Sequence, residues 1–139
     1  FLVNSLMNAE IGFTYRVLAV FLKHGISFEH IPTGIDTMSF VVDSDLLKNG
    51  VLEEVCAEIE ENVHPDNLRV ITDIALIAVV GHGMAKSVGT SARLFEAIAR
   101  AGVNVRMIDQ GSSELNIIVG VDNENYERTL KAVYEEFFD

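Results

Sequence analysis

Two glycine-containing segments have residue types that could carry chemistry. The first, residues 81–84 (GHGM) followed by Gly89, resembles a loop that binds phosphate at a helix N-terminus. The GxGxxG pattern fails because Lys86 occupies the third glycine position, and GxxxxGK[ST] does not occur, so a nucleotide site is not expected. Two interpretations stay open: free loop amides that attract a carboxylate, or an ordinary tight turn.

The second segment, residues 111–114 (GSSE), places two serines beside a glutamate. A nucleophilic serine needs a neighbouring base, but GxSxG is absent and His82 is the only histidine in this half of the chain. A turn is the simpler interpretation, in which Gly111 supplies a positive φ and the serine hydroxyls bond to neighbouring backbone. The histidines show no spacing with carboxylates that is typical of a metal site.

Composition excludes several classes of partner. The net charge of the 139 residues is −11 and the 10 basic residues are scattered, which argues against nucleic acid. No apolar run approaches the roughly 18 to 20 residues of a membrane span. A single cysteine, Cys56, favours a reducing compartment, so we expect a cytoplasmic protein, and its helical spacing predicts a buried thiol. Because the chain opens with Phe1 and shows no signal-peptide pattern, we expect a part of a longer protein.

An internal repeat organises the chain. At an offset of 77 residues, positions 12–43 align with 89–120 without a gap. The identical pairs include Gly12 with Gly89, Arg16 with Arg93, Gly25 with Gly102, Ile31 with Ile108, Gly34 with Gly111 and Val42 with Val119. We infer two copies of one unit, residues 1–72 and 73–139.

Each copy opens with the same predicted elements. An apolar run of strand length, 1–7 or 74–81, precedes a helix that ends before Gly25 or Gly102, where a left-handed residue is favoured. The inward stripes of these helices are Val17, Leu18, Phe21 and Leu22, and Leu94, Phe95, Ile98 and Ala99. Two β-rich runs then predict a hairpin, 26–32 with 38–43 in the first copy and 103–109 with 115–121 in the second.

A second helix closes each copy. In the first, Ser44 is predicted to cap a helix over 46–63, which Pro65 ends, and a strand over 68–72 follows. The inward residues are Leu52, Val55, Cys56 and Ile59 in the first copy, and Leu130, Val133, Tyr134 and Phe137 in the second. The fold class is therefore α+β, with two ferredoxin-like βαββαβ units of which the second lacks one strand. Three alternatives stay open for that strand: it is absent, it is supplied by a segment before Phe1, or it is replaced by a strand of another chain. Because an unfilled sheet edge invites association, we expect a homodimer.

The two copies differ in charge at matched positions. The first has Glu10, Glu29 and Asp36 where the second has Ser87, Arg106 and Ser113. Acids near one loop and hairpin would suit a ligand with an ammonium group as well as a carboxylate, such as lysine. An acidic protein that simply scatters its acids is the competing interpretation.

A tandem of βαββαβ units with a glycine-rich first loop resembles the ACT domain, a family of amino-acid-sensing modules. Through Gly89 and residues 94–117 (LFEAIARAGVNVRMIDQGSSELNI), the second copy is similar to the C-terminal regulatory region of aspartokinases. The first copy, with 10–13 (EIGF) and 27–36 (SFEHIPTGID), resembles that of monofunctional, lysine-responsive bacterial aspartokinases.

The resemblance implies a function and its parts. Aspartokinases phosphorylate aspartate with ATP, and their catalytic domain, with its ATP and Mg, precedes the regulatory part, so this chain is expected to need no cofactor. In the family the first unit is inserted into the second, whose remaining strand comes from the segment before the first unit. Effectors bind between units at the dimer interface.

The effector-binding residues that the resemblance implies lie near the first loop and the following strand. In the first copy they are Met7, Glu10, Gly12, Phe13, Thr14, Ser27, Phe28, Glu29, Gly34, Ile35 and Asp36; in the second they are Met84, Gly89, Asn104 and Gln110. Relatives that use threonine often engage an Asn and a Gln like the last two, whereas Ser27 and Thr33 stand there in the first copy.

We therefore expect a non-catalytic regulatory module that binds an end-product amino acid, lysine or else threonine, and inhibits an attached aspartate kinase. A purely structural dimerisation domain is the alternative. A stand-alone enzyme is disfavoured because the sequence shows no nucleophile and base at workable spacing.

Overall fold

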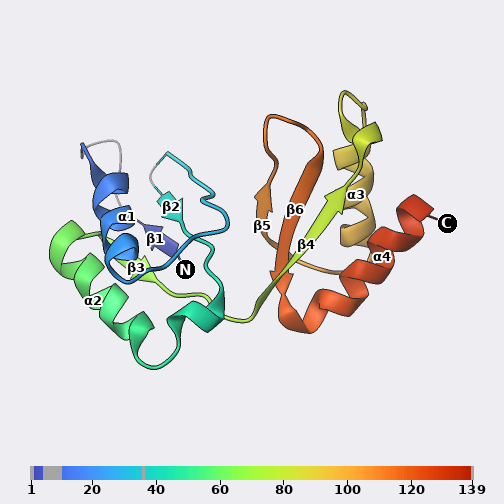
Figure 1. The fold of residues 1–139 in the computed structure, drawn as a ribbon. Coiled ribbons are helices and arrows are strands. Elements are labelled where there is room, and N and C mark those ends of the chain that lie inside the picture. The colour runs from blue at the N-terminus through green and yellow to red at the C-terminus, as the bar shows by residue number, and fades with distance from the viewer. Residues whose placement is uncertain (1, 5–10, 36, 139) are drawn as a thin grey trace. The chain divides into compact units, whose positions relative to one another are not determined.

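The computed structural model describes residues 2–4, 11–35 and 37–138, with the backbone alone described for 2–4. The chain divides into two compact units, Phe1–Thr72 and Asp73–Asp139. In the part of the chain that is described, each unit holds a three-stranded antiparallel sheet and a pair of α-helices (Figure 1).

The first unit contains the strands β1 (Leu2–Asn4), β2 (Thr37–Ser39) and β3 (Asn67–Arg69), with the helices α1 (Phe13–Lys23) and α2 (Val51–Val63). The strand order is β2-β1-β3. The apolar stripes of both helices cover the sheet, since their inward side chains form one buried core. Its members are Phe13, Val17, Val20, Phe21, Ile26, Met38, Phe40, Val55, Ile59 and Val63.

The second unit contains β4 (Ile74–Val80), β5 (Val105–Asp109) and β6 (Asn116–Asp122), with α3 (Thr90–Arg100) and α4 (Tyr126–Phe138). The strand order is β4-β6-β5, so β4 and β5 run in the same direction on either side of β6. Strand β1 pairs on both edges, whereas its counterpart β4 pairs with β6 alone among the described strands. The expected α+β class is confirmed, and among the described residues both units have three strands.

The repeated glycines after α1 and α3 end both helices in the same way. Gly25 has a φ of +67° and Gly102 a φ of +69°. The Ile26 N–H donates to the Phe21 carbonyl at 2.9 Å, and the Val103 N–H donates to the Ile98 carbonyl at 3.3 Å. These bonds are those of the Schellman motif, so the predicted left-handed helix ends are confirmed.

The first hairpin is less regular than the sequence predicts. Only Thr37–Ser39 forms a strand, and two isolated bridges, His30 with Val41 and Thr33 with Met38, link residues 30–33 to residues 38–41. Pro32 lies in this run and has no N–H to give to a ladder, although its carbonyl accepts from the Ser39 N–H at 2.9 Å. The prediction of a full strand over 26–32 is therefore wrong.

The predicted start of the second helix is also wrong. Residues Ser44–Leu47 form a separate 3₁₀ turn, capped by the Asp43 carboxylate, which accepts from the Asp45 N–H at 2.9 Å. Helix α2 begins only after Gly50, which has a φ of +84°. A left-handed pair, Asn49 and Gly50, separates the two helical segments, so Ser44 is not the cap of the long helix.

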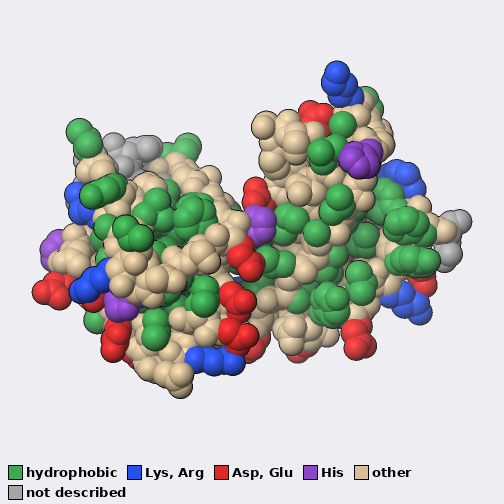
Figure 2. All heavy atoms as spheres, viewed as in Figure 1, with side chains coloured by type: hydrophobic (Ala, Val, Ile, Leu, Met, Phe, Trp, Pro, Cys, Tyr) green, Lys and Arg blue, Asp and Glu red, His purple; other side chains and the backbone are tan. Residues whose placement is uncertain are grey.

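Several apolar residues on the predicted inward faces of the helices are exposed. Leu22 is 81% exposed, and in α4 Leu130 and Tyr134 are exposed while Thr129 and Val133 are buried. Leu130 and Tyr134 instead line a groove of about 550 Å³ beside β4, whose other edge is unpaired among the described strands. Figure 2 shows apolar side chains gathered on the surface of this unit.

Cys56 is only half-buried, and this burial raises the pKa of its thiol.

An ion-pair network joins α3 to α4. The Glu136 carboxylate lies 3.0 Å from Arg93 Nε and 2.7 Å from Arg100 Nη2, and the Arg93 guanidinium stacks over the Phe137 ring at 4.8 Å. The Arg93 hydrogen bond, with that of Arg100, holds the pKa of Glu136 below its ordinary value of 4.5. The network therefore stabilises the fold above pH 4.5, and this contribution is lost as the pH falls through the lower folded-state pKa.

Glu136→Gln is expected to lower the melting temperature at pH 7 by a small amount, because the network is exposed to solvent. The difference from the unsubstituted chain should vanish at a pH below the folded-state pKa, where Glu136 is protonated in both the folded and unfolded states. Melting curves from pH 7 to pH 3 measure this. Glu135→Gln is the control, since Glu135 lies 3.8 Å from Lys131 on the exposed side of the same helix. A constant difference at all pH values would contradict the expectation.

Candidate functional site

The start of α1 positions the first group of predicted effector residues. Gly12 is the N-cap of this helix and has a φ of +82°, which disfavours any residue with a Cβ. Phe13 is 2% exposed and lies in the core, so its side chain is not available to a ligand. The Thr14 hydroxyl donates to Met38 Sδ at 3.8 Å. Helical spacing with Val17 is a signal that could have placed Phe13 in the core.

The turn before β2 lies at the same end of the sheet. Its Gly34 N–H donates to the Thr37 carbonyl at 2.8 Å. A Cβ on Gly34 would meet Thr37 Oγ1 at 2.9 Å, so close approach explains this glycine. Ile35 is 74% exposed beside it. Because Thr37 pairs with Asn4, the last residue of β1, this turn lies at the sheet end where β1 finishes.

Ser27, Phe28 and Glu29 lie at the opposite end of the first unit. The Glu29 N–H donates to the Val41 carbonyl at 2.8 Å. Val41 lies beyond Ser39, which pairs with Leu2 at the start of β1. A strand rises about 3.3 Å per residue, so the four steps from Thr37 to Val41 span roughly 13 Å. The described effector residues of this unit therefore form two groups at opposite ends of the sheet.

Three of the predicted effector residues, Met7, Glu10 and Asp36, lie outside the described residues.

The second unit repeats this division. Gly89 is the N-cap of α3 with a φ of +91°, Met84 ends a 3₁₀ turn (His82–Met84) in the same loop, and Gln110 follows β5. All three lie at the end of the sheet where β4 and β5 finish (Figure 1). Asn104 precedes β5 and lies at the other end. Within one chain, the structure does not bring Asn104 together with the other three.

The turn after β5 corrects the expectation for Gly111. Gly111 does not adopt a positive φ, and Glu114 does, with a φ of +57°. The Glu114 N–H donates to the Gly111 carbonyl at 3.1 Å. The Glu114 carboxylate Oε2 accepts from the Lys86 N–H at 2.9 Å and so joins this turn to the glycine-rich loop. Sequence reasoning missed that contact, because the two residues are 28 positions apart.

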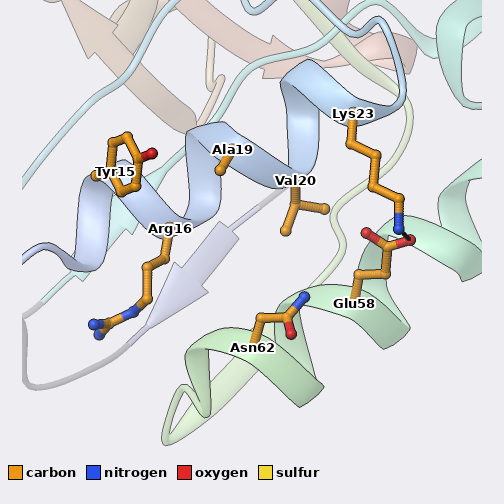
Figure 3. A pocket seen from close by; sticks show the side chains of 7 residues that line it. All are labelled: Tyr15, Arg16, Ala19, Val20, Lys23, Glu58 and Asn62. Carbon is orange, nitrogen blue, oxygen red and sulfur yellow. Dashed lines mark hydrogen bonds and ion pairs between the residues drawn. The ribbon is translucent and has the colours of Figure 1, made fainter.

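A pocket of about 260 Å³ lies between α1 and α2 in the first unit, and none of the predicted effector residues is in its lining (Figure 3). Lys23 Nζ and Glu58 Oε1 lie 2.8 Å apart across it. Their hydrogen bond raises the pKa of Lys23 and lowers that of Glu58, so both groups are charged near neutral pH. The groove beside β4 includes Met84 in its lining. Neither cavity contains the predicted effector residues of the first unit.

Among the described residues, no group of three or more His, Cys, Asp and Glu side chains could hold a metal ion. No helix in the described part of the chain is long and apolar enough to cross a membrane.

Comparison with known proteins places this fold in a family. The ACT domain family model matches residues 77–137. Aspartokinase 3 of Bacillus subtilis is 41% identical over 133 residues, which are 96% of this chain and 29% of that protein. The chain is homologous to the regulatory regions of aspartokinases. It spans less than a third of this relative's length.

Solved structures of aspartate kinases share this fold. The aspartate kinase of Clostridium acetobutylicum, described as an allosteric enzyme, superposes with a TM-score of 0.93 at 39% identity over 98% of this chain and 31% of its own. Escherichia coli aspartokinase III, solved with lysine and aspartate in the T-state, gives a TM-score of 0.75 at 26% identity over 99% of this chain and 30% of its own.

Proposed function

We propose that the chain is the allosteric regulatory module of an aspartate kinase and binds an end-product amino acid, lysine, through its first ACT unit. The observation that carries the proposal is the homology to aspartokinase regulatory regions, which extends over 96% of this chain. The lysine-bound state of the E. coli aspartokinase III relative supports the choice of ligand. In the longer chain, lysine would shift the attached kinase domain, with its ATP and Mg, toward an inactive state.

The ligand chemistry follows from the residues of the first unit. Gly12 keeps the loop backbone open to the ligand carboxylate, which the amides at the start of α1 would receive. Glu29 has an exposed side chain and is the described acid available for an ammonium group. In the second unit Arg106 occupies the matched position, and its Nη1 lies 2.6 Å from Asp122 Oδ1. A cationic ligand is therefore favoured in the first unit over the second.

We propose that a second copy of the chain completes the site. Gly12 and the turn at Gly34 lie at one sheet end, and residues 27–29 lie at the other. These two groups are too far apart to hold one lysine within a single unit. A two-fold pairing of first units brings the loop of one copy to residues 27–29 of the other. Ile11, Tyr15 and Leu22 are each more than three-quarters exposed on or beside α1, which supplies apolar area for such contact.

Thermal unfolding with added lysine, threonine or methionine tests the proposal. Lysine at a hundredfold excess over its dissociation constant should add about 2.7 kcal/mol of stability and raise the melting temperature by several degrees. Glu29→Gln should weaken the response about tenfold in lysine concentration, a loss of about 1.4 kcal/mol. Glu60→Gln, which removes an exposed acid on α2, is the matched control. A melting temperature unchanged by all three amino acids would favour the alternative, a structural dimerisation domain.

A further inference from the structure

In the second unit, the side chain of Glu114 contacts the backbone of the glycine-rich loop. Glu114 Oε2 accepts from the Lys86 backbone N–H at 2.9 Å. The bond joins the turn between β5 and β6 to the loop between β4 and α3. A hydrogen bond from an N–H to an ionised carboxylate is about twice as strong as one between neutral groups.

Both residues of this contact have unusual backbone conformations. Glu114 has a φ of +57° and Lys86 a φ of +61°, in the left-handed region that disfavours residues with a Cβ. Such conformations persist where the surrounding structure holds them. The bond between Glu114 and Lys86 ties these two positions together, so each helps to fix the other.

Backbone bonds hold other amides of the loop, one of them to Leu115 beside the same turn and two within the loop itself. The Gly81 N–H donates to the Leu115 carbonyl, the Met84 N–H to the Gly81 carbonyl and the Ser87 N–H to the Met84 carbonyl, each at 3.0 Å. With the Lys86 N–H bonded to Glu114, the amides of Gly81, Met84, Lys86 and Ser87 are bonded within the unit. A ligand carboxylate that approaches this loop meets an exposed carboxylate already bonded to it.

We propose that Glu114 is an internal substitute for an effector carboxylate, which holds the loop of the second unit closed and confines effector binding to the first unit. The inference rests on the proposed function, in which loop amides receive the carboxylate of an amino acid. In the first unit the position matched to Glu114 is Thr37, which has no carboxylate and whose Oγ1 lies against Gly34. Thr37 therefore cannot make the matching carboxylate contact in the first unit.

Glu114→Gly tests the proposal, since glycine keeps the positive φ of the turn while it removes the carboxylate. Amide hydrogen exchange and ¹⁵N NMR on the 139-residue chain are the measurements, with acetate as the carboxylate probe. The Lys86 amide should exchange at least about tenfold faster in the variant. Amide signals of residues 82–90 should move with acetate in the variant and stay in place in the unsubstituted chain. Unchanged Lys86 exchange, or equal acetate responses, would overturn the proposal.

Ser113→Gly is the matched control, because Ser113 is an exposed neighbour in the same turn. It should leave both Lys86 exchange and the acetate response as they are in the unsubstituted chain. An effect equal to that of Glu114→Gly would overturn the proposal, since it would trace the change to turn mobility. Lysine titration is followed separately on the amide signals of residues 11–35. If those signals do not respond to lysine, the proposed function is contradicted, while the acetate result still tests the role of Glu114.

Discussion

Phe40→Ala is expected to destabilise the first unit by about 3 to 5 kcal/mol, the usual cost of removing a fully buried aromatic side chain. Phe40 is 0% exposed in the core of that unit. Its ring packs edge-on against Phe21, with centroids 5.0 Å apart and an interplanar angle of 86°. The substitution removes the buried area and this aromatic contact together. Urea unfolding followed by NMR signals of each unit measures the loss.

The control for this variant is Phe28→Ala, because Phe28 lies in the same unit but is 43% exposed. Its cost should be below about 1 kcal/mol. The second unit has a core of its own, built around Leu94, Ile98 and Ile117. Amide protection in that core should therefore survive in Phe40→Ala. Loss of protection in both units to the same degree would contradict the division of the chain into two cores.

Gly12→Ala is expected to weaken lysine binding ten- to a hundredfold, a loss of about 1.4 to 2.8 kcal/mol. At a φ of +82°, a Cβ strains the backbone at the N-cap of α1. The space itself is open, since a Cβ would find only Arg16 Nη1, at 4.0 Å. Relief of the strain therefore moves the loop backbone, and with it the amides proposed to receive the carboxylate. Isothermal titration of lysine into the variant measures the loss.

Gly89→Ala is a matched control that the repeat itself provides. Gly89 caps α3 at a φ of +91°, and nothing lies within 4 Å of its added Cβ. Both variants should lose similar stability, about 1 to 2 kcal/mol, because the backbone strain is alike. Only Gly12→Ala should lose lysine affinity. Equal losses of affinity in the two variants would contradict a site in the first unit.

The repeat predicted most of the fold because each copy must bury the same faces. Gly25 and Gly102 recur since both helices end in a left-handed residue followed by a buried one, Ile26 or Val103. The other repeated glycines have separate causes that a sequence does not distinguish. Gly12 needs a positive φ, whereas Gly34 is required by the close approach of Thr37.

The candidate site was less predictable because it depends on contacts between distant positions. The bond from Lys86 to Glu114 joins residues that have no shared helical or strand spacing. The separation of Gly12 from Glu29 follows from the pairing of β1 with β2, which sets the sheet end at which each turn lies. Leu130 and Tyr134 resemble core residues by pattern, yet they line the groove beside the unpaired edge of β4.

Calorimetric titration of lysine into the unsubstituted chain tests the central claim most directly. We predict saturable heat with one lysine bound per chain, since Glu114 closes the second unit and the first unit supplies Glu29. Size-exclusion chromatography with light scattering on the same sample should show a dimer when lysine is bound. The absence of heat with lysine at millimolar concentration, from a folded chain, would contradict the claim that the first unit senses this amino acid.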